Sequence, residues 1–540
     1  MYEKNVKLLE KIIDDNKNTE YEKKYGFSKI KNVEDYKSLV PLTKYVDYEP
    51  FIQRMFDGEK NILTVYPILT YVMTTGSENF IQKYLPYSVN AVENIALKPF
   101  VIRDAIFEKY KKENKNINKC HILYIGIIHV EMDDLKEEFP KTFLLSDISY
   151  AYLCRNKTID LKYYLGGFDL MFDANTYDVL YEKIWISILE EDILEIETIY
   201  MYSILQFFIE FEKSYKDIIS DIRKKQINPK KKLSDKAKKY LLNLPVSEER
   251  LKYVEKECQK GFDGIALRLW KNMKLITGIT SKTFIYENKA LNRFIKDIPI
   301  NTFLYASSES FIGFPKEINS FSYLIDPTFS FYEFIPFNEN NNNEDKTVAL
   351  NEVENDKKYE MVLTNLSGLY RYKTGDIIKI IKNNESEIFV EFCFRKNILT
   401  FLINIKQEKF ANIHFEQTKI KMDEIIPNIF GFLLGGTTIN NIGYYFSFLC
   451  LDDNNILNID VNELEKKLDS ILIEVNMGYR LFRKSNDIGN PKIFIKNKEE
   501  FSKIQQFIKK TKSHNKPKYI IPESLLRDLL KTEGYINSSV

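Results

Sequence analysis

A loop of hydroxyl and glycine residues follows the apolar run at residues 61–73 and leads, after a short gap, to Lys83. Backbone amides and hydroxyls in such a loop can cradle phosphate oxygens, and a lysine adds a point charge. The same residue types also make ordinary polar turns, so the loop alone leaves both interpretations open. The residues that would contact phosphate are Thr74, Thr75, Gly76 and Ser77.

Two later stretches carry carboxylates at the ends of expected strands. In "YASSES", residues 305–310, Tyr305 could stack on a base, and Glu309 could offer oxygen ligands to Mg²⁺. The alternative is a polar turn with a solvated glutamate. In "GLYRYKTGDIIKI", residues 368–380, Asp376 follows Gly375 between two strand-like runs. A carboxylate there could accept both hydroxyls of a ribose, but a Thr-Gly-Asp hairpin turn fits the local pattern equally well.

Two basic positions complete the set. Arg395 lies at the end of an expected strand in "EFCFRKN" and could reach a phosphate or a ribose. Near the C-terminus, "KSHNKPKYI", residues 512–520, holds lysines that domain closure could deliver to an active site. The alternatives are an ordinary strand-end arginine and a basic solvated tail.

The order of these stretches is more specific than any single stretch. A hydroxyl and glycine loop, an aromatic-Ser-Glu motif, a Gly-Asp turn, an arginine and a late lysine follow one another. This order resembles the acyl-adenylate-forming superfamily, which includes firefly luciferase and the acyl-CoA synthetases. The segments "YASSESFIGFP", "FSFYEFIP" and "YEMVLTNLSGLYRYKTGDIIKI" resemble the Gretchen Hagen family of acyl acid amido synthetases in particular. The similarity extends over roughly residues 20–409.

This resemblance implies a reaction in two steps. ATP and a carboxylic acid, with Mg²⁺, would give an acyl-adenylate and pyrophosphate, and the amine of an amino acid would then form an amide and release AMP. The implied roles are phosphate binding by Thr74, Thr75, Gly76, Ser77 and Lys83, adenine contact by Tyr305 and Ser308, Mg²⁺ binding by Glu309, and ribose binding by Asp376 with Arg395 close by.

The sequence departs from the family pattern at several positions. Phe80 stands where the family loop has its second glycine, and Ser310 replaces the glycine after the metal-binding glutamate. Phe394 replaces the glycine of a Gly-Arg pair. The family's late catalytic lysine falls on Asn515, and it matches Lys516 only if one residue is deleted. Two alternatives therefore stay open: a catalytically weakened homologue that binds a nucleotide or acyl ligand, and an acyl-CoA-forming ligase.

The elements that must position these residues are expected to form an α/β fold. The first 60 residues predict helices, with breaks at Pro41 and Pro50, and residues 176–225 have a helical periodicity. Strands that meet glycine-containing loops are expected at 269–279 and 302–315, and antiparallel strands at 357–396. We expect a large adenylation domain with sheets, helices and a small β-barrel at residues 1–395, and a smaller mobile α+β domain at residues 396–540.

The bulk composition narrows the class of protein. The chain has 540 residues and a net charge of +1, which gives no electrostatic case for binding nucleic acid or an anionic membrane. Its five cysteines are scattered without a CxxC pair, which favours reduced thiols in the cytoplasm. No apolar stretch is long enough to span a bilayer, and the first residues lack the apolar core of a signal peptide. We expect a soluble monomer or weak dimer whose partners are a small carboxylic acid and an amino acid.

Overall fold

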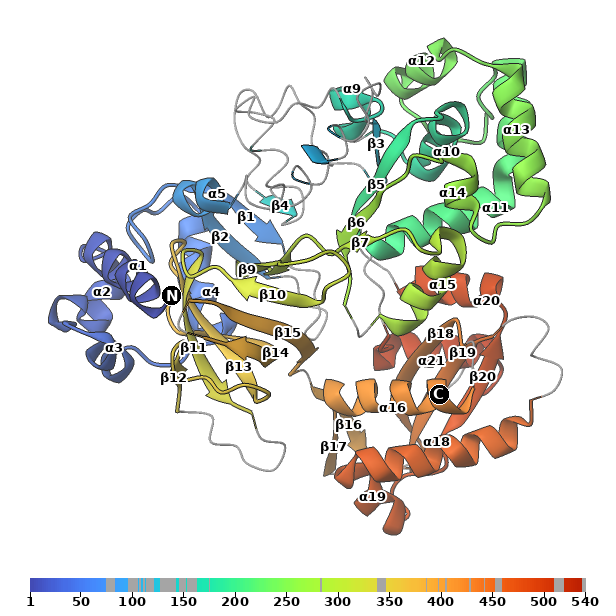
Figure 1. Ribbon diagram of the computed structural model, residues 1–540. Coiled ribbons are helices and arrows are strands. Elements are labelled where there is room, and N and C mark those ends of the chain that lie inside the picture. Colours follow the sequence, from blue (N-terminus) through green and yellow to red (C-terminus); the bar gives the residue numbers. More distant parts are fainter. Residues whose placement is uncertain are drawn as a thin grey trace. The chain divides into compact units, whose positions relative to one another are not determined.

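The computed structural model has two compact units (Figure 1). The first contains residues 1–281 and 291–393, and the second contains residues 282–290 and 394–540. The structure describes residues 1–73, 83–95, 105, 108–109, 112, 121–126, 142–144, 152, 163–173, 175–281, 284–337, 346–384, 386–396, 398–403, 406–426, 429–440, 442–451, 459–508 and 519–536.

Short helices make up most of the first 56 residues, as expected: α1 (Tyr2–Asp15), α2 (Glu20–Tyr25), η1 (Phe27–Lys29), α3 (Val33–Leu39) and α4 (Tyr45–Phe56). Side-chain caps define the starts of α2 and α3, because Thr19 accepts the Glu22 amide and Asn32 accepts the Asp35 amide in the first turn of each helix. The break at Pro41 is confirmed, but the break at Pro50 is wrong, because Pro50 lies inside α4. The buried residues Tyr48, Ile52 and Met55 hold α4 against the core despite the proline.

An antiparallel sheet of eight strands forms the centre of the first unit, in the order β12-β11-β13-β14-β15-β10-β9-β8. Side chains from this sheet and from the N-terminal helices share one apolar core, which includes Ile12, Tyr36, Phe331 and Met361. The antiparallel strands expected at 357–396 are confirmed. The strand bounds are β8 (Tyr305–Ser307), β9 (Ser310–Pro315), β10 (Ser322–Ile325), β11 (Ser330–Pro336), β12 (Val348–Ala349), β13 (Lys358–Asn365), β14 (Tyr372–Asn383) and β15 (Ile388–Arg395).

A parallel sheet in the order β3-β5-β6-β7 is the second sheet of this unit (Figure 1). Its strands are β3 (His121–Tyr124), β5 (Ile193–Tyr200), β6 (Leu275–Ile279) and β7 (Ile300–Asn301). The helices around it are α9 (Gly167–Met171), α10 (Val179–Leu189), α11 (Met201–Lys224), α12 (Asp235–Asn243), α13 (Glu248–Gln259) and α14 (Ile265–Leu269).

The expectation of continuous helix over 176–225 is wrong in its middle. Residues 193–200 form β5, which separates α10 from α11. This strand is buried on both faces, so its isoleucines do not alternate with exposed residues, and periodicity alone cannot tell such a strand from a buried helix. Gly278 likewise lies inside β6 rather than in a following loop. A side chain there would collide with Thr198, so the glycine permits close packing of β5, β6 and the start of α11.

A third, small sheet has the order β2-β1-β4, with β1 (Ile68–Met73), β2 (Tyr84–Ser88) and β4 (Thr142–Leu144). Strand β1 pairs antiparallel with β2 and parallel with β4. Helix α5 (Val89–Ile95) follows β2 directly. The sheet therefore holds both ends of the segment that joins β1 to Lys83.

The second unit is built around β18 (Gly431–Ile439), β19 (Ile442–Cys450) and β20 (Lys492–Lys496). Its sheet separates two apolar cores, because Phe432 and Leu434 face one of them and Leu433 faces the other. A separate hairpin consists of β16 (Ile398–Ile403) and β17 (Lys406–Ala411). The helices are α16 (Asn412–Ile425), α18 (Val461–Val475), α19 (Met477–Lys484), α20 (Lys498–Ile508) and α21 (Glu523–Thr532), and α15 (Ile285–Ile295) begins in this unit and ends in the first.

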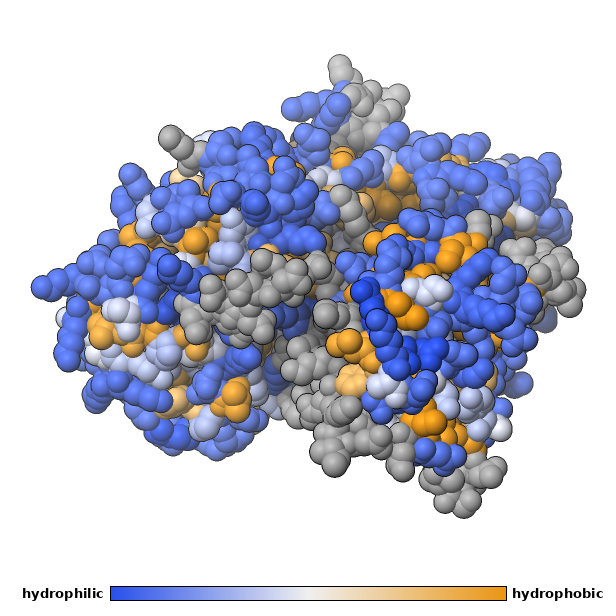
Figure 2. All heavy atoms as spheres, turned by 90° about the horizontal axis from the view of Figure 1, so that it is seen from below, coloured by the Kyte–Doolittle hydropathy of each residue, from blue (hydrophilic) through white to orange (hydrophobic). Residues whose placement is uncertain are grey.

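The surface seen in Figure 2 is mostly hydrophilic, with small apolar areas among the polar ones. Large exposed apolar side chains include Val46, Tyr177 and Leu481. Single residues of this kind are normal on protein surfaces. No helix in the described part of the chain is long and apolar enough to cross a membrane.

Candidate active site

The centre of the candidate site is a hydrogen bond between Tyr305 and Asp376. The Tyr305 hydroxyl donates to Asp376 Oδ2 at 3.0 Å, and both side chains are buried. Tyr305 opens β8, and its ring lies against the rings of Tyr323 and Phe392, with centroids 5.5 Å and 5.9 Å away. Burial raises the pKa of Tyr323 to about 12, so this neighbour stays neutral. Aromatic packing therefore fixes the tyrosine that orients the Asp376 carboxylate.

Asp376 is placed by a β-bulge rather than by a hairpin turn. It lies within β14, and the β13–β14 register shifts between Glu360 and Val362, opposite residues 373–377. Gly375 has φ +75°, a conformation that glycine adopts at little cost. The Thr374 hydroxyl donates to the Met361 carbonyl and accepts the Asp376 amide. The hairpin-turn interpretation is thus wrong, and bulges commonly re-aim side chains beside active sites.

Ser308 and Glu309 form the tight turn between β8 and β9. Glu309 is buried, and its backbone carbonyl accepts a hydrogen bond of 2.8 Å from Asn365 Nδ2 at the end of β13. The buried Tyr87 of β2 lies close to Glu309. Burial, and secondly the Glu309 charge, hold the pKa of Tyr87 well above its ordinary value. A buried carboxylate and a neutral phenol from two different sheets thus meet at this turn.

Lys83 lies immediately before β2 and is half-buried. Its ammonium group is 5.5 Å from the centroid of the Tyr45 ring in α4. At the other end of β2, the Ser88 amide donates to Ser367 Oγ at 3.0 Å, and the Ser88 hydroxyl donates to the Leu366 carbonyl. Strand β2 is therefore fastened to the loop that leads from β13 into β14, the strand of Asp376.

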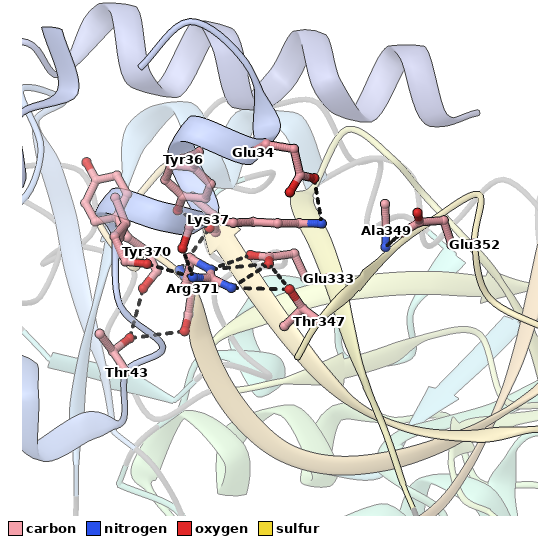
Figure 3. Close-up of polar contacts among 12 residues, drawn as sticks. Glu34, Tyr36, Lys37, Thr43, Glu333, Thr347, Ala349, Glu352, Tyr370 and Arg371 are labelled. Carbon is pink, nitrogen blue, oxygen red and sulfur yellow. Dashed lines mark hydrogen bonds and ion pairs between the residues drawn. The ribbon is translucent and has the colours of Figure 1, made fainter. Parts of the chain in front are cut away.

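Arg371 anchors the start of β14 (Figure 3). Its buried guanidinium donates to both carboxylate oxygens of Glu333 in β11. It also donates to the carbonyls of Lys37 and Val40, each at 2.7 Å, and to the Thr347 hydroxyl at 3.2 Å. Arg371 has φ +48°, which is uncommon for a residue with a side chain. This network therefore holds a left-handed backbone five residues before Asp376.

The structure brings four of the predicted residues together, namely Tyr305, Ser308, Glu309 and Asp376. Arg395 is half-buried at the last position of β15, next to the border between the units. The other predicted positions lie outside the described residues: Thr74, Thr75, Gly76, Ser77, Phe80, Asn515 and Lys516.

Sequence reasoning missed Tyr87, Asn365 and Arg371 as parts of this site. The only local signal for Arg371 was its place in "GLYRYKTGD", and its partners Glu333 and Val40 lie more than 30 positions away in the chain. Tyr87 lies on a different sheet from Glu309, so no spacing rule could connect them. The alternative that Glu309 is a solvated surface residue is wrong, because the side chain is buried.

The described residues include no group of three or more His, Cys, Asp or Glu side chains that could hold a metal ion. Magnesium is, however, commonly bound by one or two carboxylates together with the phosphates of a substrate. The single buried carboxylate of Glu309 suits that kind of site. The carboxylate of Asp376, oriented by Tyr305, likewise suits a pair of ribose hydroxyls.

Comparisons with known proteins agree with this arrangement. Three family models match the chain: the GH3 family N-terminal domain at residues 3–300, the central domain at 323–395 and the C-terminal domain at 437–523. The chain is 25% identical to indole-3-acetic acid-amido synthetase GH3.10 of Arabidopsis thaliana, over 92% of this chain and 88% of that protein. It is 24% identical to jasmonoyl–L-amino acid synthetase GH3.5 of Oryza sativa subsp. japonica, over 92% and 87%.

Solved structures share the fold. The acyl acid amido synthetase AtGH3.15, solved in complex with 2,4-DB, has a TM-score of 0.80 at 19% identity, covering 99% of this chain and 94% of that chain. A 2-hydroxyisobutyryl-CoA ligase solved with 2-HIB-AMP has a TM-score of 0.52 at 9% identity, covering 98% and 91%. The expected α/β fold, with a large N-terminal domain and a smaller C-terminal domain, is thereby confirmed.

Proposed function

The chain belongs to the GH3 family, and from this membership we propose that it is an ATP-dependent acyl acid amido synthetase. In the first step, an oxygen of a carboxylic acid attacks the α-phosphorus of ATP and pyrophosphate leaves. In the second step, the amine of an amino acid attacks the acyl carbon, and AMP leaves with the bonding electron pair. The products are an amide, AMP and pyrophosphate.

The observation that carries this proposal is the buried Tyr305–Asp376 hydrogen bond. Glu309 lies close by in the sequence, in the turn that follows the strand of Tyr305. The Asp376 carboxylate would accept both ribose hydroxyls, and the Tyr305 hydroxyl keeps it pointed at them. Hydrogen bonds to a charged group are each worth about 1.5–3 kcal/mol, so this pair would contribute much of the nucleotide affinity. The Tyr305 ring and Ser308 would lie along the adenine.

Glu309 would hold Mg²⁺, which neutralises charge on the phosphates when it is bound. The low exposure of Glu309 excludes water and strengthens its attraction for a cation. Thr74, Thr75, Gly76 and Ser77 would donate to phosphate oxygens, and Lys83 would offer its ammonium group. Donors placed where charge develops lower the barrier of the first step.

We assign residues 1–395 to adenylation and residues 396–540 to a mobile domain that completes the site. Arg395, at the border, would contact the ribose or a phosphate. Lys516 would be the catalytic lysine delivered by domain closure. We further propose that the protein works in the cytoplasm as a monomer or weak dimer, without binding nucleic acid or a membrane. The described cysteines Cys258, Cys393 and Cys450 are free thiols, which suits that compartment.

The second candidate, a weakened homologue that only binds a nucleotide or acyl ligand, rests on the departures at Phe80, Ser310, Phe394 and Asn515. Ser310 does not support it. Its backbone φ is not positive, so the serine costs no strain there. Its hydroxyl donates to the Phe311 carbonyl and forms a 2.8 Å hydrogen bond with the Ser330 hydroxyl. The change is thus accommodated within the sheet.

Pyrophosphate release, measured over a panel of carboxylic acids with ATP and Mg²⁺, tests the proposal. We expect release with at least one acid, and amide formation when a mixture of amino acids is added. Release followed by transfer to the thiol of coenzyme A, but to no amine, would instead identify an acyl-CoA-forming ligase. ATP binding without release for any acid would favour the weakened homologue.

A further inference from the structure

A row of polar side chains crosses the parallel sheet of the first unit. Tyr124 of β3 pairs with Glu197 of β5, Glu197 pairs with Thr277 of β6, and Thr277 pairs with Asn301 of β7. Residues in register on adjacent parallel strands point to the same face, so the four side chains lie side by side. All four are buried. Strands of buried parallel sheets are normally apolar throughout, so this row calls for a physical reason.

Two members of the row have polar atoms without a hydrogen-bond partner in the described structure. Thr277 is 2% exposed, and its hydroxyl has no hydrogen-bond partner there. Asn301 is 1% exposed, and its Nδ2 group has no partner there either. Asn301 Oδ1 accepts the Phe303 amide at 3.2 Å, which fixes the side chain and leaves Nδ2 as the donor. The buried hydroxyl of Ser307, in β8 of the antiparallel sheet, likewise has no hydrogen-bond partner in the described structure. Each such group lowers the stability of the fold, and native proteins keep few of them.

The row lies next to the candidate active site. The backbone carbonyl of Thr280, just beyond β6, accepts a long hydrogen bond of 3.5 Å from the Tyr323 hydroxyl, and the Tyr323 ring packs on Tyr305. Asn301 ends β7 only four residues before Tyr305. Asn301 is the last residue of β7, and Thr277 pairs with it from the middle of β6. The carboxyl ends of the strands are the edge where parallel sheets bind ligands. The opposite face is closed, because Gly278 packs against Thr198 and the start of α11.

We propose that Thr277 and Asn301 recognise an oxygen on the acyl part of the substrate, so that this enzyme selects hydroxy or keto acids over their unsubstituted counterparts. This inference rests on the proposed function and specifies its substrate class. The Asn301 amide and the Thr277 hydroxyl would donate to the substrate oxygen. A site built to hydrogen-bond an oxygen strongly rejects the analogue that lacks it, because the buried donors then stay unpaired.

Acidic side chains beside Thr277 indicate which kind of oxygen group the substrate carries. Glu197 is buried beside Thr277, and its Oε2 accepts a 2.8 Å hydrogen bond from the Tyr164 hydroxyl. Glu195 lies on the same face, two residues earlier in β5, and is also buried. A second carboxylate on the substrate would lie close to these two acidic side chains and be repelled by negative charge. A neutral hydroxyl or keto oxygen avoids that cost, so the favoured substrates are monocarboxylic acids.

The test uses the full-length protein and acids in matched pairs. Short straight-chain and phenyl-substituted acids are supplied with and without one hydroxyl or keto oxygen, and pyrophosphate release gives kcat/KM for each. We expect at least one oxygen-bearing acid to exceed its unsubstituted partner by about tenfold or more, the factor that one hydrogen bond supplies. Thr277→Val and Asn301→Leu should each bring this ratio close to one. Equal rates within every pair, or a ratio that survives both substitutions, would overturn the inference.

Thr198→Val is the matched control. It removes a buried threonine hydroxyl from the same sheet, but on the opposite face, where that hydroxyl donates to the Ile125 carbonyl at 2.8 Å. We expect Thr198→Val to lower the midpoint of thermal unfolding. It should leave unchanged the ratio of kcat/KM between the oxygen-bearing acid and its unsubstituted partner. Thr277→Val should not lower the midpoint, since it removes a group that has no partner among the described residues.

Failure of the proposed function would show separately, as wild type that releases no pyrophosphate with any acid. In that case the inference is tested by binding alone. The midpoint of thermal unfolding is measured with each acid in the absence of ATP. Stabilisation by oxygen-bearing acids in wild type, and its loss in Thr277→Val, supports the binding site. Equal effects of both members of each pair refute it.

Discussion

At the residue scale, the Tyr305–Asp376 hydrogen bond separates a binding carboxylate from a structural one. A carboxylate that only caps a turn is satisfied by backbone amides, whereas Asp376 receives its described side-chain bond from a phenol. The bulge at Gly375 turns the carboxylate toward Tyr305, and aromatic packing holds Tyr305 in place. This geometry is pre-organised before a nucleotide arrives, which reduces the entropy lost on binding.

We therefore predict that Asp376→Asn loses about 10- to 100-fold in ATP affinity, because charge-assisted bonds to the ribose become neutral ones. Tyr305→Phe should lose less, since it frees the carboxylate without removing it. Calorimetric titration with ATP·Mg²⁺, on variants whose circular dichroism matches wild type, measures both losses. Equal affinity of Asp376→Asn and wild type would assign Asp376 to a purely structural role.

At the element scale, Arg371 joins three elements: helix α3, strand β11 and the start of β14. Removing one partner of a buried ion pair leaves the other charge uncompensated, which typically costs 3–5 kcal/mol. We predict that Arg371→Met lowers the free energy of unfolding by about that amount in a urea titration. The double variant Arg371→Met/Glu333→Leu should recover a large part of it, because no buried charge remains. A double variant as unstable as the single one would contradict this account.

A second buried charge cluster ties the first half of α15 to α16. Lys419 is fully buried, forms an ion pair of 2.9 Å with Glu416, and lies 4.6 Å from the centroid of the Tyr519 ring. Glu287 of α15 accepts a 2.8 Å hydrogen bond from the Tyr519 hydroxyl. Burial raises the pKa of both Glu287 and Glu416, and the Lys419 charge opposes that rise. The lysine is therefore what allows two acids to be buried together.

This cluster gives a pH-dependent prediction. Because the folded-state pKa values of Glu287 and Glu416 are raised above 4.5, their stabilising contribution is present below that pH and is lost as pH rises. In Lys419→Met the two pKa values should rise further. We predict that this variant is destabilised more at about pH 7.5 than at about pH 5, where the acids bind protons. Urea titrations of variant and wild type at both values measure the difference, and a pH-independent loss would contradict it.

The elements also show where sequence reasoning succeeded and where it could not. The strands at 357–396 were predictable because alternating residues and turn signals are local. The strand at 193–200 was not, because burial on both faces removed the alternation that distinguishes strand from helix. At the site, the order of motifs identified Tyr305, Glu309 and Asp376. Arg371 and Tyr87 depend on partners from distant segments, and only the folded chain shows those contacts.

At the scale of the whole molecule, the two units are not simply two successive parts of the sequence. Residues 282–290 belong with the C-terminal unit, whereas the rest of α15 belongs with the first. In that segment Glu287 contacts Tyr519, Lys289 forms an ion pair with Asp423, and the Phe284 ring lies 6.0 Å from the Tyr519 ring. A fragment that ends at residue 395 keeps α15 but loses these partners.

We predict that this fragment, residues 1–395, is cut by trypsin after Lys289 faster than the full chain is. Helix ends without tertiary partners fray, and proteases cut frayed segments. Lys213 and Lys216, in the middle of α11, serve as internal controls, because α11 lies wholly within the first unit. Mass spectrometry of timed digests follows each site. Cleavage after Lys289 at the full-chain rate, with α11 intact in both, would mean that the first unit alone holds the whole of α15, and the natural boundary would then be the contiguous one near residue 395.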